Sequence, residues 1–349
     1  MPSLQALQVA RLGLWTHPVF DQVVTESRGL ALSVLPAVAG HPATWAGLGQ
    51  ARAYHVSAAK DELPSCWWVG DALLARCPGL LCVSSSGAGY DTIDVAACTD
   101  AGVAVVNQAG ANAASVAEMT FALLLALVKR LALSATALRS GTAASREMLM
   151  GNEIEGRVLG IVGLGAIGRR VAHIAAGFGM RSIAYDPLLT ADEIRARGAE
   201  PASFAALLQQ ADVVSLHCPL NSASRGMMNA DAYARMKSGS LFLSTARGGI
   251  HDETALQGAL ESGHLAGAGL DVWRVEPPPS NHPLLQREDV VATYHTGGVT
   301  HEGRRKVAEG SARQIAAMLA GERPPQLLNP EVWPRFLERL AQAAAAMAA

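Results

Sequence analysis

One segment near the middle of the chain restricts its fold more than any other. Residues 157–171, RVLGIVGLGAIGRRV, place Gly163-x-Gly165-x-x-Gly168 between an apolar stretch and an amphipathic one. A second apolar stretch, SIAYD, follows and ends in Asp186, 18 residues after Gly168. Three glycines between a strand and a helix, with an acid at the end of the next strand, are typical of a dinucleotide-binding βαβ unit.

Each part of this motif has a physical purpose. Gly163 permits the tight turn, Gly165 lets the backbone approach a pyrophosphate, and Gly168 lets the helix pack closely on the strand. The helix start directs free N–H groups toward phosphates. Asp186 can accept hydrogen bonds from ribose hydroxyls and would repel a 2′-phosphate, and residues 187–189 contain no arginine. NAD is therefore favoured over NADP. The alternative is that the glycines serve only helix–strand packing.

The pattern around the motif predicts an α/β fold. Apolar stretches alternate with helical ones from Arg157 onward, and they read VLGIVG, SIAYD, VVSLHCP, LFLSTAR, AGAGLDVW and VVATYH. This alternation indicates a parallel sheet covered by helices on both faces, with ligands outside the C-terminal ends of the strands. Upstream, LLCVSSSGAGYD predicts a strand entering a glycine loop. SVAEMTFALLLALVKRL predicts a long buried helix that begins with a capping box formed by Ser115 and Glu118.

Three chemically useful side chains follow three of these predicted strands. Arg247 ends LFLSTARGG, Glu276 follows AGAGLDVWRV and precedes three prolines, and His295 ends VVATYH. A histidine is a natural proton donor near neutral pH, and a neighbouring carboxylate orients it and favours its charged form. An arginine can hold a substrate carboxylate and polarise a carbonyl. Taken singly, each residue has an ordinary alternative as a solvated charge or a loop histidine.

Composition excludes several other classes of protein. The chain has 349 residues, half of them hydrophobic, and a formal net charge of −2, which suits two globular domains and indicates neither a nucleic-acid nor a membrane partner. The five cysteines lack C-x-x-C spacing, so neither a disulfide framework nor a metal site is expected. The longest apolar run, residues 121–128, is too short to span a bilayer, and no signal peptide is apparent. We therefore expect a cytoplasmic protein.

The motifs together resemble those of the D-isomer-specific 2-hydroxyacid dehydrogenases, a family that includes phosphoglycerate, glyoxylate/hydroxypyruvate and D-lactate dehydrogenases. The resemblance spans about residues 78–330 and rests on GAGYDTID, GVAVVNQAGANAASVAE, GLGAIGRRVA, LHCPL, TARGG, GLDVWRVEP and HTGGVT. It implies two Rossmann-like domains, with a central NAD-binding domain inserted in a flavodoxin-like substrate domain. The implied bounds are 1–108 and 302–349 for the substrate domain and 109–301 for the NAD domain. It also implies a homodimer, with a dimerisation helix near 115–140.

The resemblance also implies roles for individual residues. Arg247, Glu276 and His295 match the catalytic arginine, glutamate and histidine. Backbone N–H groups of the loop Ser86, Gly87, Ala88 and Gly89 match those that hold the substrate carboxylate. Cofactor contacts are implied for Gly163, Gly165, Ala166, Ile167, Gly168, Asp186, His217, Cys218, Pro219, Thr245, Ala246, Asp271, Gly297 and Gly298, with Asp271 taking the nicotinamide carboxamide.

Departures from the family pattern bear on the substrate. Tyr294 stands where the family usually has proline, and it would shift His295 or line the pocket. Ser85 stands where phosphoglycerate dehydrogenases commonly carry an arginine, which disfavours phosphoglycerate. Trp67 and Trp68 fall where the small domain borders the cleft, so they form either an apolar wall for a bulky 2-keto acid or ordinary core packing.

Two other functions fit the same motifs. One is a non-catalytic NADH-sensing scaffold, which would bind NADH without reducing a 2-keto acid. The other is a related dehydrogenase with a different donor, such as formate or phosphite. L-specific lactate and malate dehydrogenases fit poorly, because their glycine motif lies near the N-terminus rather than at residue 163.

Overall fold

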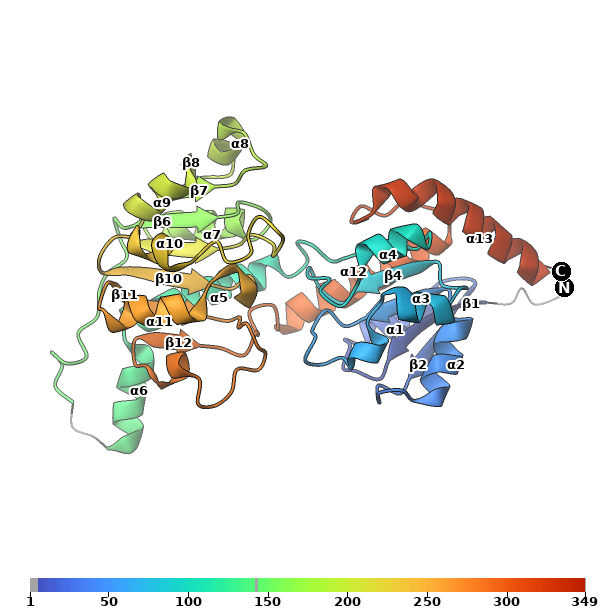
Figure 1. Ribbon diagram of the computed structural model, residues 1–349, viewed down its shortest axis with the longest axis horizontal. Helices are drawn as coiled ribbons and strands as arrows, with labels where there is room; N and C mark the ends of the chain where they lie inside the picture. The colour runs from blue at the N-terminus through green and yellow to red at the C-terminus, as the bar shows by residue number, and fades with distance from the viewer. Residues whose placement is uncertain (1–5, 142–143, 349) are drawn as a thin grey trace. The chain divides into compact units, whose positions relative to one another are not determined.

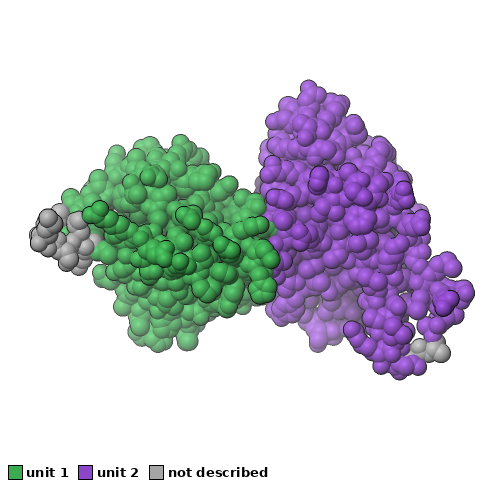
Figure 2. Space-filling view, turned by 180° about the vertical axis from the view of Figure 1, so that it is seen from behind, with its two compact units in different colours: residues 1–112, 301–349 green, residues 113–300 purple. Residues whose placement is uncertain are grey.

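The computed structural model describes residues 6–141 and 144–348, and the chain divides into two compact units. Unit 1 comprises the described residues up to Asn112 and those from His301 onward, and unit 2 comprises Ala113–Thr300. The two are coloured separately in Figure 2. Unit 2 therefore interrupts unit 1 along the chain. The prediction of an α/β chain with two Rossmann-like domains, one inserted in the other, is confirmed.

Unit 2 is built on a seven-stranded parallel sheet with the order β12-β11-β10-β9-β6-β7-β8 (Figure 1). The strands are β6 (Val158–Val162), β7 (Arg181–Tyr185), β8 (Glu200–Pro201), β9 (Val213–Leu216), β10 (Ser240–Ser244), β11 (Leu265–Leu270) and β12 (Val290–Ala292). β7 and β8 lie on one side of β6 in the sheet, and β9 to β12 lie on its other side. This reversal makes the ends of β6 and β9 the place where such sheets bind ligands.

Helices cover both faces of this sheet. One face packs on α5 (Ala113–Val128), α7 (Gly168–Gly177) and α8 (Ala191–Ala196) through a core that includes Phe121, Val171 and Ile194. The other face packs on α9 (Phe204–Gln210), α10 (Ala230–Ala234) and α11 (Glu253–Glu261). Because both faces are covered, every residue of the central strands β6, β9 and β10 is buried, and most of these residues are apolar.

The helix predicted near 115–140 is in fact two helices. α5 ends at Val128, α6 (Leu131–Ser140) follows, and the two are bent by 61°. Arg130 between them adopts a left-handed backbone with φ 51°. The carbonyl of Val128 accepts from the N–H of Asn152 instead of from a continuing helix.

The capping box predicted at Ser115 is wrong. The helix already starts at Ala113, so Ser115 lies inside its first turn, and its hydroxyl lies 2.8 Å from that of Thr300. Within the described residues no single helix is long and apolar enough to cross a membrane; the bent pair α5 and α6 passes only on combined length and composition.

Unit 1 holds a five-stranded parallel sheet with the order β2-β1-β3-β4-β5. Its strands are β1 (Leu7–Leu12), β2 (Leu30–Leu35), β3 (Ala53–Val56), β4 (Cys82–Ser85) and β5 (Ala104–Val106). α2 (Pro42–Gln50), α3 (Asp71–Arg76) and α4 (Val95–Asp100) cover one face. α1 (Val19–Glu26), α12 (His301–Leu319) and α13 (Trp333–Ala348) cover the other. The last two helices return to this unit after the whole of unit 2.

The paired tryptophans have different environments. Trp67 is fully buried in the unit 1 core, 4.7 Å from the ring of Trp45, so an apolar pocket wall that includes it is wrong. Trp68 is partly buried, and its indole N–H donates to the Leu63 carbonyl. The two adjacent side chains therefore differ in burial. Of the two alternatives, a pocket wall or core packing, Trp67 takes core packing. All five cysteines are free thiols.

Candidate active site

The glycine turn connects β6 to α7 at the sheet reversal. Gly163 has φ 92°, a left-handed conformation that side chains rarely adopt, and a Cβ there would lie 2.7 Å from the Cys218 nitrogen. At Gly168 a Cβ would collide with the Gly163 carbonyl, so only glycine permits this closeness of turn and helix. Nothing lies within 4 Å of the Cβ position of Gly165. The backbone of this turn is therefore open to a ligand at the start of α7, where Ala166 and Ile167 also lie.

Asp186 is joined directly to this turn. Its Oδ2 accepts from the Leu164 N–H at 2.9 Å and its Oδ1 from the Leu188 N–H at 3.0 Å. A carboxylate held beside free N–H groups at a helix start suits a ribose next to a pyrophosphate. These residues therefore fit the adenosine half of a dinucleotide.

The segment after β9 forms the opposite wall of the turn. His217 and Cys218 pack against Gly163, and the His217 Nε2 lies 2.8 Å from the Ser215 hydroxyl. Burial lowers the pKa of His217 to about 3, so its ring is neutral. Burial also raises the pKa of the Cys218 thiol to about 11. The segment completed by Pro219 thus presents an uncharged surface beside the turn.

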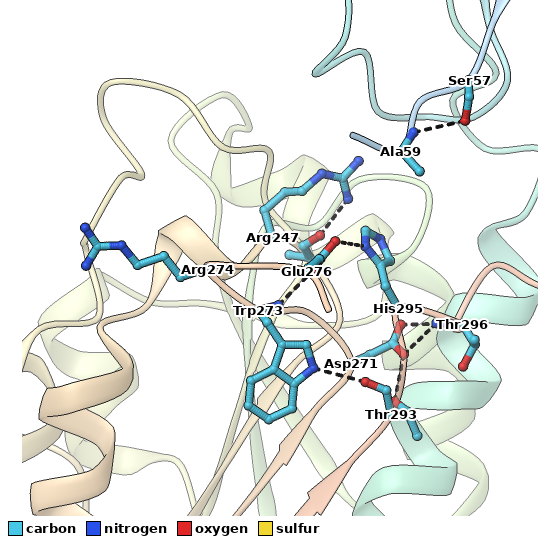
Figure 3. Close-up of polar contacts among 12 residues, drawn as sticks. Ser57, Ala59, Arg247, Asp271, Trp273, Arg274, Glu276, Thr293, His295 and Thr296 are labelled. Carbon is cyan, nitrogen blue, oxygen red and sulfur yellow. Dashed lines mark hydrogen bonds and ion pairs between the residues drawn. The ribbon is translucent and has the colours of Figure 1, made fainter. Parts of the chain in front are cut away.

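Three neighbouring strands carry Arg247, Glu276 and His295 to one edge of the sheet. β10, β11 and β12 are adjacent and parallel, and each residue follows the C-terminal end of one of them. The Glu276 Oε2 lies 2.7 Å from the His295 Nδ1, and Figure 3 shows the two side chains turned toward each other. Gly248, next to Arg247, has no room for a Cβ against the backbone of Trp273, so the loops after β10 and β11 touch.

The environment keeps Glu276 ionised. Burial works to raise its pKa, but hydrogen bonds and charge from His295, the N–H of Trp273 and the charge of Arg247 outweigh it, so the net pKa is lowered. The Trp273 N–H donates to Oε1 at 2.9 Å, which fixes the carboxylate independently of the histidine. The bond between Glu276 and Pro277 is cis. A charged carboxylate therefore faces one ring nitrogen and leaves the other, Nε2, for a reactant.

Asp271 organises the loop that carries the histidine. It directly follows β11 and is 1% exposed. Its Oδ1 accepts from the Thr293 hydroxyl and the Thr296 N–H, and its Oδ2 accepts from the Gly297 N–H. His295 itself has φ 50° and donates its N–H to the Asp271 carbonyl. A non-glycine residue in this conformation must be held by its surroundings. Gly298 continues the same loop.

Two further predicted contacts lie beside this loop. Thr245 and Ala246 are nearly buried directly after β10, and the Thr245 hydroxyl lies 3.2 Å from that of Thr120 on α5. The Ala246 carbonyl accepts from Arg247 Nη1 at 2.6 Å. Tyr294 is 66% exposed and so lies outside the core of the unit.

The predicted carboxylate loop lies in unit 1, after β4. Three of its four carbonyls are occupied: Gly87 accepts from the Gln108 N–H, Ala88 from the Asn107 amide and Gly89 from the Ser85 hydroxyl. The Ser86 N–H donates to the Val56 carbonyl, and its hydroxyl accepts from the Ala58 N–H. Among the described residues, the N–H groups of Gly87, Ala88 and Gly89 have no acceptor. Three successive amides are thus available to an anion, whereas that of Ser86 is not.

Comparison with known proteins gives this geometry a context. Residues 121–297 match the model of the D-isomer specific 2-hydroxyacid dehydrogenase, NAD binding domain. The chain is 40% identical over 258 residues to a glyoxylate reductase of Korarchaeum cryptofilum, covering 73% of this chain and 78% of that protein.

The chain belongs to the D-isomer-specific 2-hydroxyacid dehydrogenases. A second relative of this NAD-dependent family, an (S)-sulfolactate dehydrogenase of Chromohalobacter salexigens, is 42% identical over 237 residues, or 68% of this chain and 76% of that one. The D-lactate dehydrogenase of Aquifex aeolicus, solved with NAD and lactic acid, superposes with a TM-score of 0.79 at 25% identity, over 92% of this chain and 98% of that one.

Sequence reasoning missed some of what this dehydrogenase uses to build the site. Nothing in the sequence marked the Trp273 N–H as a partner of Glu276, or Thr293 and Thr296 as partners of Asp271. The only signal was that GLDVW places an acid at a strand end. No group of three potential metal-binding side chains occurs in the described part of the chain.

Proposed function

We propose that the chain is an NADH-dependent reductase of a 2-keto acid, which also works in reverse on a D-2-hydroxy acid. The observation that carries this proposal is the distance of 2.7 Å between Glu276 Oε2 and His295 Nδ1. This pair lies at the C-terminal edge of the same sheet that carries the glycine turn after β6. Asp186, with no arginine directly after it, supports NADH over NADPH.

The proposed mechanism gives His295 the proton. NADH, when held by the glycine turn and Asp186, would supply the hydride for the carbonyl carbon. In the reductive direction the charged imidazole donates its Nε2 proton to the carbonyl oxygen, and in the oxidative direction the neutral ring accepts it. Glu276 holds Nδ1 and balances the ring charge, which is the arrangement expected of an oriented general acid. Arg247 binds the substrate carboxylate and polarises the carbonyl.

In unit 1, the N–H groups of Gly87, Ala88 and Gly89 are assigned to the substrate carboxylate. Three successive N–H groups without an acceptor among the described residues are suitable donors to an anionic group. Unit 1 would then be the substrate domain and unit 2 the NAD-binding domain. In unit 2, Asp271 Oδ2 accepts one bond from the loop and has a lone pair for the nicotinamide carboxamide.

We further propose a cytoplasmic homodimer that uses α5 and α6. Within the described part of the chain no side chain of α6 is fully buried, and Leu131 and Leu138 on it are 54% and 82% exposed. Exposed leucines on a helix with no fully buried side chain are a common mark of a subunit interface. The charge and composition of the chain support neither a nucleic-acid nor a membrane partner.

The test is NADH oxidation, with NADPH in parallel, against glyoxylate, hydroxypyruvate, pyruvate, 2-ketoisocaproate, phenylpyruvate and oxaloacetate. We expect reduction of at least one acid and a preference for NADH. His295→Ala should lower turnover by about 10²- to 10⁴-fold and leave NADH binding nearly intact. NADH binding without any turnover on the panel would favour a sensing scaffold, and loss of binding together with turnover would remove His295 from the assigned role.

A further inference from the structure

Arg304 is a half-buried cation to which the described residues supply no counter-ion. It lies in the second turn of α12, and in the described parts of the chain its guanidinium takes part in no hydrogen bond or ion pair. Its guanidinium carbon lies over the ring of Trp15, 5.8 Å from the ring centroid. Trp15 is itself 67% exposed and meets His17 edge-on at 6.4 Å. A partly desolvated charge that lacks a partner in its own chain is suited to an anion from outside.

Strand register places Trp15 at the edge of the sheet that bears the carboxylate loop. Arg11 of β1 pairs with His55 of β3, and Val56 pairs with Ser85 of β4. The three strands therefore end at nearly the same level. The loop with Trp15 and the loop of residues 86–89 consequently leave the same edge, with only the end of β3 between them.

α12 brings Arg304 to this edge. The Ser311 hydroxyl donates to the Ser85 carbonyl at the end of β4, and Gln314 donates to the Asn107 carbonyl just after β5. Residues further along α12 pack on the middle of the strands. Arg304 precedes Ser311 by seven positions, so it lies on the same side of the helix and about 10 Å further along its axis. That step carries its side chain past the strand ends and over the loops.

We propose that Arg304, with Trp15 beside it, binds the distal group of the substrate and selects 2-keto acids that carry a second anionic group, a carboxylate or a sulfonate. A guanidinium binds such oxyanions with paired, charge-assisted hydrogen bonds. The indole face of Trp15 supports the guanidinium and offers an apolar surface to the carbons between the two anionic ends. The inference rests on the proposed function, because it takes the first carboxylate to bind at Gly87–Gly89.

The test compares substrates that differ in the distal charge. Oxaloacetate is paired with 2-ketopentanoate, and 2-ketoglutarate with 2-ketohexanoate, while glyoxylate serves as the acid with no distal group. We expect the unaltered enzyme to show a higher kcat/KM for at least one dianionic acid than for its uncharged partner. Arg304→Gln should lower that kcat/KM by about 10- to 100-fold, mainly through KM, and change the value for glyoxylate less than about twofold.

Matched variants separate this role from general effects. Arg305→Gln removes the neighbouring exposed charge and should change neither value, whereas Arg304→Lys should keep part of the preference. NADH titration of each variant checks that the chain is folded. If glyoxylate is reduced but neither dianionic acid is preferred, or if Arg304→Gln lowers glyoxylate equally, Arg304 does not select the distal group and only this inference fails. If no 2-keto acid is reduced at all, the proposed function fails and this inference fails with it.

Discussion

Glu276 and His295 reach each other from the ends of two adjacent parallel strands, with Oε2 and Nδ1 2.7 Å apart. Each residue also has a partner other than the pair itself. The Trp273 N–H holds the Glu276 carboxylate, and the Asp271 carbonyl accepts from the His295 backbone N–H. The pair is therefore preorganised, which is what an oriented proton donor requires.

Glu276→Gln should move the pH profile of the enzyme while keeping a hydrogen bond to the histidine. The amide removes the negative charge that favours the charged imidazole, so protonation of the catalytic group should require a lower pH. We expect the alkaline limb of keto-acid reduction and the acidic limb of hydroxy-acid oxidation both to move to lower pH. A displacement of one pH unit corresponds to about 1.4 kcal/mol of lost interaction.

The measurement is kcat/KM from pH 5 to 10 in both directions. Glu288→Gln, which removes an exposed carboxylate, is the matched control and should leave the profile in place. Limbs that stay where they are in Glu276→Gln would show that the carboxylate does not act through the ring.

Asp271→Asn should disturb the histidine loop. One amide hydrogen must then face the N–H of Thr296 or Gly297, which leaves a buried donor without an acceptor at a cost of about 1–3 kcal/mol. We expect a lower kcat with little change in the KM of the 2-keto acid, together with a lower unfolding temperature. Thr293→Val, which deletes a single bond to the same carboxylate, should have a smaller effect of the same kind. An unaltered kcat in a destabilised Asp271→Asn would mean that the aspartate is structural only.

Much of this site could be predicted because its position follows from general rules. Parallel strands place their C-terminal ends at one edge, so Arg247, Glu276 and His295 were expected together once the apolar stretches were taken as strands. The glycine motif could be interpreted because an apolar strand precedes it and Asp186 follows the next strand. These features depend on local pattern and on chain handedness.

The features that could not be predicted depend on tertiary contacts. The sequence VKRLAL favours a helix, yet the chain bends at Arg130 because Asn152, far along the chain, takes the Val128 carbonyl. Trp67 and Trp68 are adjacent residues of the same type. Only Trp67 is completely buried, in the unit 1 core against Trp45, and the sequence does not distinguish the two. The sequence does not indicate that the N–H groups of Gly87, Ala88 and Gly89 lack acceptors among the described residues. This depends on which groups the folded chain places around the loop after β4.

Asp186→Asn should weaken the preference for NADH. Asparagine keeps a carbonyl oxygen for the Leu164 or Leu188 N–H, so the glycine turn should remain, but it no longer repels a 2′-phosphate. We expect the ratio of kcat/KM for NADH to that for NADPH to fall by about 10-fold, which is about 1.4 kcal/mol. The two values are measured with the same 2-keto acid at saturation. A ratio that does not change would assign the cofactor preference to another residue.

His251→Leu should make the enzyme less sensitive to acid. His251 is 3% exposed, and neither of its ring nitrogens has a hydrogen-bond partner among the described residues. Burial lowers its pKa from 6.5 to about 4. Above pH 6.5 the ring is neutral in both the folded and the unfolded chain and has no effect on the pH dependence. Below pH 6.5, His251 is protonated in the unfolded chain but stays neutral in the folded chain. The free energy of unfolding therefore falls as the pH drops toward 4. At pH 5 this loss amounts to about 2 kcal/mol. Leucine cannot bind the proton and fills a similar volume beside Phe242, so the difference in unfolding temperature between pH 7.5 and pH 5 should shrink.

His173→Gln, at an exposed position on α7, is the matched control and should keep the full difference. An equal acid response in the unaltered enzyme and in His251→Leu would assign the loss to His55 and His217, whose pKa values are also lowered by burial, to about 4 and about 3.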